Sequence, residues 1–188
     1  MSKIRFTEPN REILARRDSI INDLTRLVDP AGLITSTDEC RAYETDALTA
    51  YRKMPLAVVL PKTTEEVSAV LKYCHDTGVK VVPRGAGTSL AGGAIPSEDA
   101  VVLGLSKMNR VLAVNYDDRF IRVEAGVTNL SVTAVVAENG FFYAPDPSSQ
   151  LACTIGGSIA NNSGGAHCLK YGVTTNNLLG VRMVLIDG

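Results

Sequence analysis

A strand–helix–strand pattern in the first half of the chain constrains the fold more than any other feature. The apolar run LAVVLP (56–61) is continuous and ends in proline, which is typical of a strand buried on both faces. VKVVP (79–83) predicts the next strand. Between the two, Thr63 and Glu66 have the spacing of a capping box, and Gly78 is placed as a helix C-cap. This order predicts a βαβ unit with a right-handed crossover and parallel strands.

The second half of the chain has a different pattern, which favours a hairpin and short helices. The predicted elements are a third strand AVVLGL (100–105), a hairpin of Val111–Asn115 with Phe120–Glu124 that turns at Asp117 and Asp118, a helix from 128 to Gly140, and a closing strand GVRMVLIDG (180–188). A parallel unit followed by a hairpin indicates an α+β protein of two lobes, with glycine-rich segments at their junction.

The amino-terminal part is expected to be helical and then irregular. One helix is predicted to begin at Asn10, a suitable N-cap, and to end at Pro30. From Thr35 to Pro55 the pattern weakens, which predicts a connector. We therefore divide the chain into an amino-terminal helical segment and connector (1–54) and a main domain (55–188).

Composition and charge exclude several classes of function. With 19 basic and 20 acidic residues and a net charge of −1, the chain lacks the basic face of a nucleic-acid-binding protein. It has no apolar run long enough for a membrane span and no secretion signal, so we expect a cytoplasmic protein with reduced thiols. The four cysteines form no C-x-x-C pair, and no metal site is predicted.

The segment PRGAGTSLAGG is rich in glycine and directly follows a predicted strand. It lacks the Gly-Lys-Ser/Thr ending of a P-loop, and it is not followed by the helix of a dinucleotide fingerprint. Two interpretations remain. One is a plain connecting loop. The other is a backbone nest in which Gly85, Gly87, Thr88 and Ser89 offer N–H and hydroxyl donors to phosphate oxygens, with Arg84 as the counter-charge.

A second glycine-rich segment, TIGGSIANNSGG, is polar and almost uncharged. Asparagine amides both donate and accept hydrogen bonds, which suits the edges of a neutral heterocycle. Gly156 and Gly157 would let a flat ring lie against the main chain, although an elaborate internal turn is the alternative. Together, one segment suited to anions and one suited to a polar ring indicate a dinucleotide cofactor.

Three segments resemble those of a known family: YETDALTAYRKMPLAVVLPKTTEEV, PRGAGTSLAGG and YAPDPSSQLACTIGGSIANNSGGAHCLKYG. Their order and spacing are similar to the FAD-binding domain of the p-cresol methylhydroxylase and vanillyl-alcohol oxidase type. Within it, the chain most resembles the FAD-linked subunit of glycolate oxidase, in the branch that includes D-lactate and D-2-hydroxyglutarate dehydrogenases. The resemblance begins near Ala42 and implies a two-lobed α+β fold, with a parallel βαβ lobe followed by a mixed or antiparallel lobe.

The resemblance also implies FAD as the cofactor and names the residues that hold it. The pyrophosphate would lie in the first glycine-rich segment, and the flavin and ribityl chain would lie along the second. The implied binding residues are Arg84, Gly85, Ala86, Gly87, Thr88, Ser89, Pro145, Asp146, Thr154, Gly156, Gly157, Asn161, Asn162 and Gly164.

Two departures from the family bear on how FAD is attached. Relatives with covalent flavin often carry a histidine near the position of Thr88, and threonine cannot form that bond, so we expect non-covalent FAD. Cys153 is displaced from the position of a second anchor and is expected to be a small buried thiol.

The activity implied by the resemblance is oxidation of a small 2-hydroxy acid, glycolate first, with D-lactate or D-2-hydroxyglutarate as alternatives. Electrons would pass to a carrier or partner, such as a second flavoprotein subunit and an iron–sulfur subunit, which could hold the protein at the inner face of the membrane.

Family members are more than twice as long and add a cap domain that completes the active site. We therefore expect a carboxyl-terminally incomplete chain without a catalytic base, and a non-catalytic flavin-binding module is a further alternative. For His167, a structural hydrogen bond is favoured over a place at the flavin.

Overall fold

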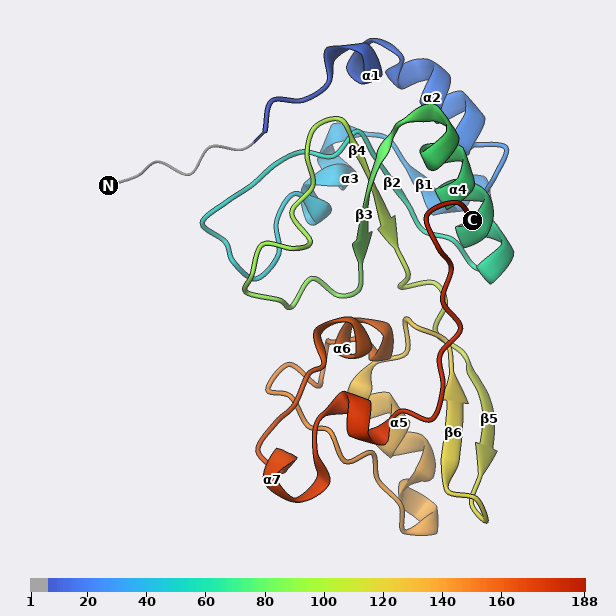
Figure 1. The fold of residues 1–188 in the computed structure, drawn as a ribbon, viewed down its shortest axis with the longest axis vertical. Coiled ribbons are helices and arrows are strands. Elements are labelled where there is room, and N and C mark those ends of the chain that lie inside the picture. The colour runs from blue at the N-terminus through green and yellow to red at the C-terminus, as the bar shows by residue number, and fades with distance from the viewer. Residues whose placement is uncertain (1–6) are drawn as a thin grey trace. The chain divides into compact units, whose positions relative to one another are not determined.

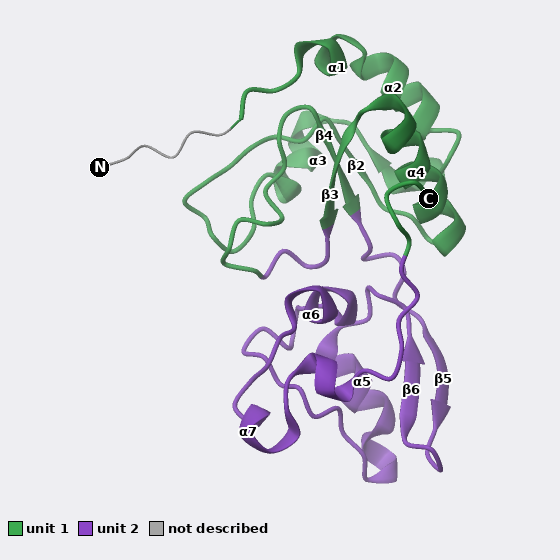
Figure 2. Ribbon diagram, in the orientation of Figure 1, with its two compact units in different colours: residues 1–83, 89–103, 184–188 green, residues 84–88, 104–183 purple. Residues whose placement is uncertain are grey.

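The computed structural model describes residues 7–188, which divide into two compact units (Figures 1 and 2). The first unit comprises the residues up to 83 together with 89–103 and 184–188, and the second comprises 84–88 and 104–183. The chain crosses from the second unit to the first after Thr88, within the first glycine-rich segment. The predicted boundary at residue 54 stays a prediction.

A four-stranded sheet forms the centre of the first unit. Its strands lie in the order β1 (Leu33–Ile34), β2 (Ala57–Val59), β4 (Ala100–Gly104) and β3 (Lys80–Arg84). β1 is antiparallel to β2, and β2 is parallel to β4, while β3 and β4 point the same way in Figure 1. β2 is fully buried, as its continuous apolar sequence predicted, and β4 lies between the two strands of the predicted βαβ unit.

The helix of the βαβ unit, α4 (Thr64–Thr77), has the predicted ends. Thr63 Oγ1 accepts the N–H of Glu66 at 3.1 Å, and Gly78 ends the helix with a φ of +73°. The capping box is present in part, because the Glu66 carboxylate accepts the N–H of Lys62, at 2.6 Å, rather than that of Thr63.

The single amino-terminal helix that we predicted is wrong, because the structure has two helices, α1 (Arg11–Ala15) and α2 (Arg17–Leu24). The N–H of Arg16 bonds to the carbonyl of Ile13, and this 3₁₀-type bond tightens the turn and ends α1. Asn10 does cap α1, since its side chain accepts the N–H of Glu12 at 2.9 Å.

Short elements fill the predicted connector and the approach to it. They are β1, a 3₁₀ turn at Pro30–Gly32, α3 (Thr37–Cys40) and a 3₁₀ turn at Arg41–Tyr43.

The second unit is built on the predicted hairpin and three helices. Its elements are β5 (Val111–Asn115), β6 (Phe120–Val123), α5 (Asn129–Val136), a 3₁₀ turn at Ala137–Asn139, α6 (Ile155–Asn161), α7 (Cys168–Tyr171) and a 3₁₀ turn at Thr174–Asn177. β5 and β6 are antiparallel, which confirms the hairpin. Val127, Val132 and Ile155 form its buried core. The result is the α+β organisation that the sequence predicted.

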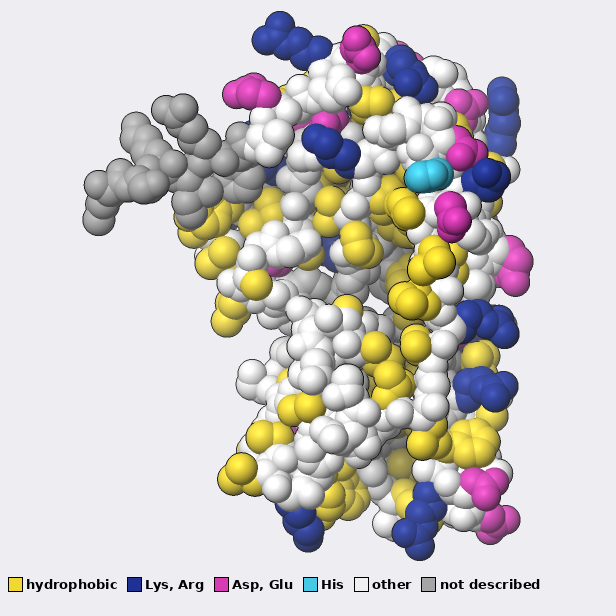
Figure 3. Space-filling view, viewed as in Figure 1, with side chains coloured by type: hydrophobic (Ala, Val, Ile, Leu, Met, Phe, Trp, Pro, Cys, Tyr) yellow, Lys and Arg dark blue, Asp and Glu magenta, His cyan; other side chains and the backbone are white. Residues whose placement is uncertain are grey.

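The predicted closing strand at 180–188 is wrong. This segment does not form a strand. A strand needs a neighbouring strand to pair with its N–H and C=O groups, and no described residues pair with this segment. Val181, Met183 and Leu185 are instead 61%, 72% and 60% exposed, and Figure 3 shows hydrophobic side chains at the surface along its course. Among residues 7–188, no helix has both the length and the apolar character needed to cross a membrane.

Candidate functional site

The first glycine-rich segment leaves β3 as an irregular loop, and no helix follows it. Gly87 has a φ of +71°, which L side chains rarely adopt. A Cβ at Gly87 would also overlap the guanidinium of Arg84, so this cation lies directly against the loop. The loop therefore combines a positive charge with a backbone that only glycine accommodates.

The backbone N–H groups of this loop are free to bind a ligand. Among residues 7–188, the six N–H groups from Gly85 to Leu90 have no hydrogen-bond partner. Consecutive unpaired N–H groups beside a cation form an anion-binding nest. This observation favours the nest over a plain connecting loop, and it fits the pyrophosphate of a dinucleotide.

The second glycine-rich segment contains helix α6, which the sequence did not predict. Thr154 begins the helix, since its Oγ1 accepts the N–H of Gly157 at 3.2 Å. The N–H groups of Ile155 and Gly156 bond at 2.8 Å to the carbonyls of Val127 and Ala125. The first turn of α6 therefore offers these donors to the protein itself and not to a ligand.

Glycines bring the two segments together within the second unit. A Cβ at Gly85 would lie 2.6 Å from Thr154 Oγ1 and 3.7 Å from the Cα of Gly157, so the loop packs against the start of α6. Gly156 packs against Ala125, whose Cβ would lie 2.8 Å from a Cβ at that position. Close approach of backbones, rather than flexibility, accounts for these glycines. That a flat ring lies over Gly156 and Gly157 stays a prediction.

Asparagine side chains shape the end of α6. Asn161 donates to the carbonyl of Gly157 at 3.0 Å, and Asn162 accepts the N–H of Thr175 at 3.0 Å. Asn162 has a φ of +48°, so it ends the helix in the left-handed conformation. Gly164 follows, where a Cβ would lie 2.7 Å from Val173. The amides predicted to meet a heterocycle thus have partners inside the protein.

Asp146 joins two turns of the second unit. Its Oδ2 lies 2.6 Å from Nδ1 of His167, and its Oδ1 accepts the His167 N–H at 3.3 Å. The hydrogen bond from His167 is the main reason that the pKa of Asp146 is lowered. Gly165 lies against the Asp146 backbone, and Asn129 donates to the carbonyl of Pro145 at 3.0 Å. The structural hydrogen bond favoured for His167 is present.

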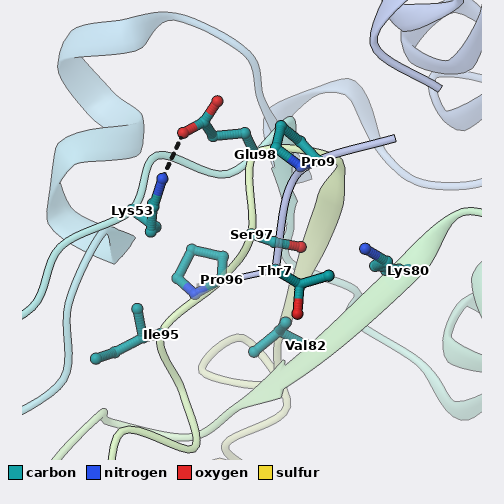
Figure 4. A pocket seen from close by; sticks show the side chains of 9 residues that line it. All are labelled: Thr7, Pro9, Lys53, Lys80, Val82, Ile95, Pro96, Ser97 and Glu98. Atoms are coloured by element: carbon teal, nitrogen blue, oxygen red, sulfur yellow. Dashed lines mark hydrogen bonds and ion pairs between the residues drawn. The ribbon is translucent and has the colours of Figure 1, made fainter. Parts of the chain in front are cut away.

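A shallow hollow of about 320 Å³ in the first unit is distinct from these segments (Figure 4). Its lining includes Lys53 and Lys80, which form ion pairs with Glu98 at 2.8 Å and with Asp99 at 2.7 Å. Both cations of the hollow are therefore already neutralised, and we assign it no ligand. Among the residues that the structure describes, no three His, Cys, Asp or Glu side chains gather as a metal site would require.

The fold is of the α+β class, and its first glycine-rich loop presents unpaired backbone N–H groups next to Arg84. The sequence model of the FAD binding domain family matches residues 55–188, and the chain belongs to this family. FAD is accordingly its cofactor.

Three relatives illustrate the range of the family. The glycolate oxidase subunit GlcD of Escherichia coli (strain K12) is 47% identical over 172 residues, which are 92% of this chain and 34% of that protein. A D-lactate dehydrogenase of Archaeoglobus fulgidus is 39% identical over 90% of this chain and 38% of its own length. A mitochondrial D-2-hydroxyglutarate dehydrogenase of Bos taurus is 34% identical over 89% of this chain and 31% of its own. The chain thus spans about a third of the length of these relatives.

Solved structures agree with the fold. An alkyldihydroxyacetonephosphate synthase has a TM-score of 0.76 at 22% identity, covering 90% of this chain and 33% of that one. p-Cresol methylhydroxylase has a TM-score of 0.68 at 20% identity, covering 82% and 30%. The predicted two-lobed fold of the p-cresol methylhydroxylase type is confirmed.

Proposed function

We propose that this chain is the FAD-binding part of a flavoprotein that oxidises a small 2-hydroxy acid to the 2-oxo acid, with glycolate as the substrate. The loop of six unpaired N–H groups beside Arg84 carries the proposal for cofactor binding. The 47% identity to a glycolate oxidase subunit supports the choice of substrate. D-Lactate and D-2-hydroxyglutarate are the second candidates, supported by relatives at 39% and 34% identity.

Within this proposal, the chain's residues place the cofactor, and FAD supplies the acceptor for a hydride equivalent from the substrate carbon. The loop of residues 84–89 would hold the pyrophosphate through its N–H groups and the guanidinium of Arg84. Asp146, Thr154, Gly157 and the turn around Asn162 would form the wall along the flavin. Thr88 has no imidazole with which to form the bond that a histidine makes to flavin, so FAD would be held non-covalently.

The proposed electron acceptor is a partner, either a carrier or a second flavoprotein subunit together with an iron–sulfur subunit. Such an assembly would place the protein in the cytoplasm, with peripheral attachment at the inner face of the membrane through the partner. Co-purification of the natural protein, followed by measurement of iron and labile sulfide, tests this part of the proposal.

The substrate is tested by anaerobic mixing of the natural flavoprotein with glycolate, D-lactate or D-2-hydroxyglutarate while the visible flavin absorbance is followed. We expect glycolate to bleach the flavin fastest. If D-lactate or D-2-hydroxyglutarate bleached the flavin faster than glycolate, that acid would be the substrate instead. Bleaching by none of the three would support the alternative of a non-catalytic FAD-binding module.

The 188-residue chain alone, loaded with FAD, should not be bleached by any of these acids. Proximity and orientation of substrate groups contribute roughly 7–11 kcal/mol to a typical rate acceleration, and we identify no positioned general base among residues 7–188. Rapid bleaching of this chain would place catalytic groups within it, and His167 would then be the first residue to substitute.

A further inference from the structure

Asp46 holds a carboxylate oxygen for which the described residues provide no donor. The residue is only 4% exposed. Its Oδ1 accepts the N–H of Leu48 at 2.9 Å, whereas its Oδ2 is buried and has no hydrogen-bond partner among residues 7–188. Such an atom lowers the stability of a folded protein, so its presence favours a role that is not structural.

The segment around Asp46 is firmly held, so the unpaired oxygen does not result from a loose loop. Thr45 Oγ1 donates to the carbonyl of Tyr51 at 2.9 Å, and the N–H of Lys53 donates to the carbonyl of Glu44 at 2.8 Å. These two bonds close the segment from 44 to 53 into a compact loop. Asp46 is therefore fixed in place before any ligand binds.

This loop is joined to the first glycine-rich segment at Ser89, and Asp46, Ala47 and Ser89 all belong to the first unit. The N–H of Ala47, the residue next to Asp46, donates to the carbonyl of Ser89 at 3.1 Å. Ser89 Oγ accepts the N–H of Ala91 at 3.3 Å, but the hydroxyl proton of Ser89 has no acceptor among the described residues. The Asp46 carboxylate oxygen without a donor and the Ser89 hydroxyl without an acceptor therefore lie on either side of the hydrogen bond between Ala47 and Ser89.

We propose that Asp46 is a positioning residue for the first glycine-rich segment. In the FAD-bound protein the Ser89 hydroxyl donates to Asp46 Oδ2, while the Ser89 N–H stays available to a phosphate oxygen. A carboxylate repels phosphate, so the two cannot bind each other directly. Ser89 can serve both, because its hydroxyl donates to the carboxylate of Asp46 and its N–H donates to the phosphate. This inference rests on the proposed function, because it concerns the loop that would hold the pyrophosphate.

The test is the substitution Asp46→Asn, which keeps the oxygen that bonds to Leu48 and replaces the unpaired one with a donor. FAD affinity is measured by quenching of flavin fluorescence, and the melting temperature is measured without FAD. We expect about tenfold weaker FAD binding, the effect of one lost charge-assisted hydrogen bond. We also expect an unchanged or higher melting temperature, because the substitution removes a buried oxygen that has no donor among residues 7–188.

Ser89→Ala should weaken FAD binding to a similar extent, and the double variant should lose little more, since the two residues act through one bond. Asp99→Asn is the matched control. Asp99 is a buried carboxylate of the same unit whose partners Lys80, Ser97 and the Asn10 N–H are all in place. Its loss should lower the melting temperature and leave FAD affinity unchanged.

If the Asp46→Asn variant bound FAD as tightly as the unsubstituted chain, the inference about Asp46 would be overturned, but the proposed function would stand. A melting temperature lowered as in Asp99→Asn, or fully additive losses from Asp46→Asn and Ser89→Ala, would overturn the inference as well. Failure of the unsubstituted chain to bind FAD would instead contradict the proposed function, and the inference would fall with it.

Discussion

Gly85 and Thr154 lie so close together that Gly85 has room for a hydrogen and not for a methyl group. A Cβ there would stand 2.6 Å from Thr154 Oγ1. The same oxygen accepts the N–H of Gly157 and begins helix α6. One hydroxyl therefore both caps a helix and supports the loop that would hold the cofactor phosphates.

Gly85→Ala should destabilise the protein by about 1–3 kcal/mol, the usual cost of overpacking, because neither the loop nor the capped hydroxyl can move freely. Thr154→Ala should itself cost about 1 kcal/mol through loss of the cap. Urea unfolding of both single variants and the double variant measures the coupling. We expect Gly85→Ala to cost clearly less when Thr154 is already alanine. The same cost in both backgrounds would mean that the two residues do not touch.

Asp99 should make folding stability depend on pH in the acid range. Burial alone would raise the pKa of Asp99, but the hydrogen bonds from Lys80, Ser97 and the Asn10 N–H outweigh it and lower the pKa to about 2. Because the folded pKa lies below the ordinary value of 3.8, this contribution is present above about pH 4 and is lost as the pH falls toward 2.

The measurement is the difference in unfolding free energy between the unsubstituted protein and Asp99→Asn at a series of pH values. We expect this difference to shrink by about 2 kcal/mol between pH 6 and pH 2. Other carboxylates titrate equally in both proteins and cancel. A difference that does not change with pH would show that Asp99 is not ionised in the folded protein.

Local sequence signals predicted the elements that depend on local interactions. The ends of α4 follow from Thr63 and Gly78, and the hairpin of β5 and β6 follows from its turn residues. The positive φ of Gly87 agrees with the conformational demand that the glycine-rich loop suggested. The position of this loop after a strand and its residue types suggested an anion-binding nest but left a plain connecting loop as the alternative.

Elements that depend on distant partners could not be predicted in this way. Helix α6 contains two adjacent glycines, which are poor helix formers, and its first turn is secured by carbonyls of Ala125 and Val127 that lie far away in the sequence. The segment from 180 to 188 has the apolar composition of a strand, but composition cannot supply a pairing partner. The unpaired oxygen of Asp46 has no sequence signal, because it depends on which donors the fold brings near.

FAD should be released completely when the holoprotein is denatured. Thr88 cannot form the bond that a histidine forms in covalently flavinylated proteins, and the Cys153 thiol is only 6% exposed, which leaves it little access to a flavin. Acid precipitation of the yellow holoprotein, followed by absorbance of the supernatant and the pellet, checks this. Flavin that remains with the washed pellet would show a covalent bond, and Cys153→Ser would then identify its site.

Titration of the 188-residue chain with FAD, followed by flavin fluorescence, tests the assignment of residues 84–89 as the phosphate-binding loop most directly. Gly87→Val places a β-branched side chain at a φ of +71° and against the Arg84 guanidinium, so it should deform the loop. Gly93→Val is the matched control, since a Cβ at Gly93 meets no atom within 4 Å. We predict saturable binding by the unsubstituted chain and by Gly93→Val, and none by Gly87→Val. Full FAD binding by a folded Gly87→Val variant would contradict the assignment of this loop.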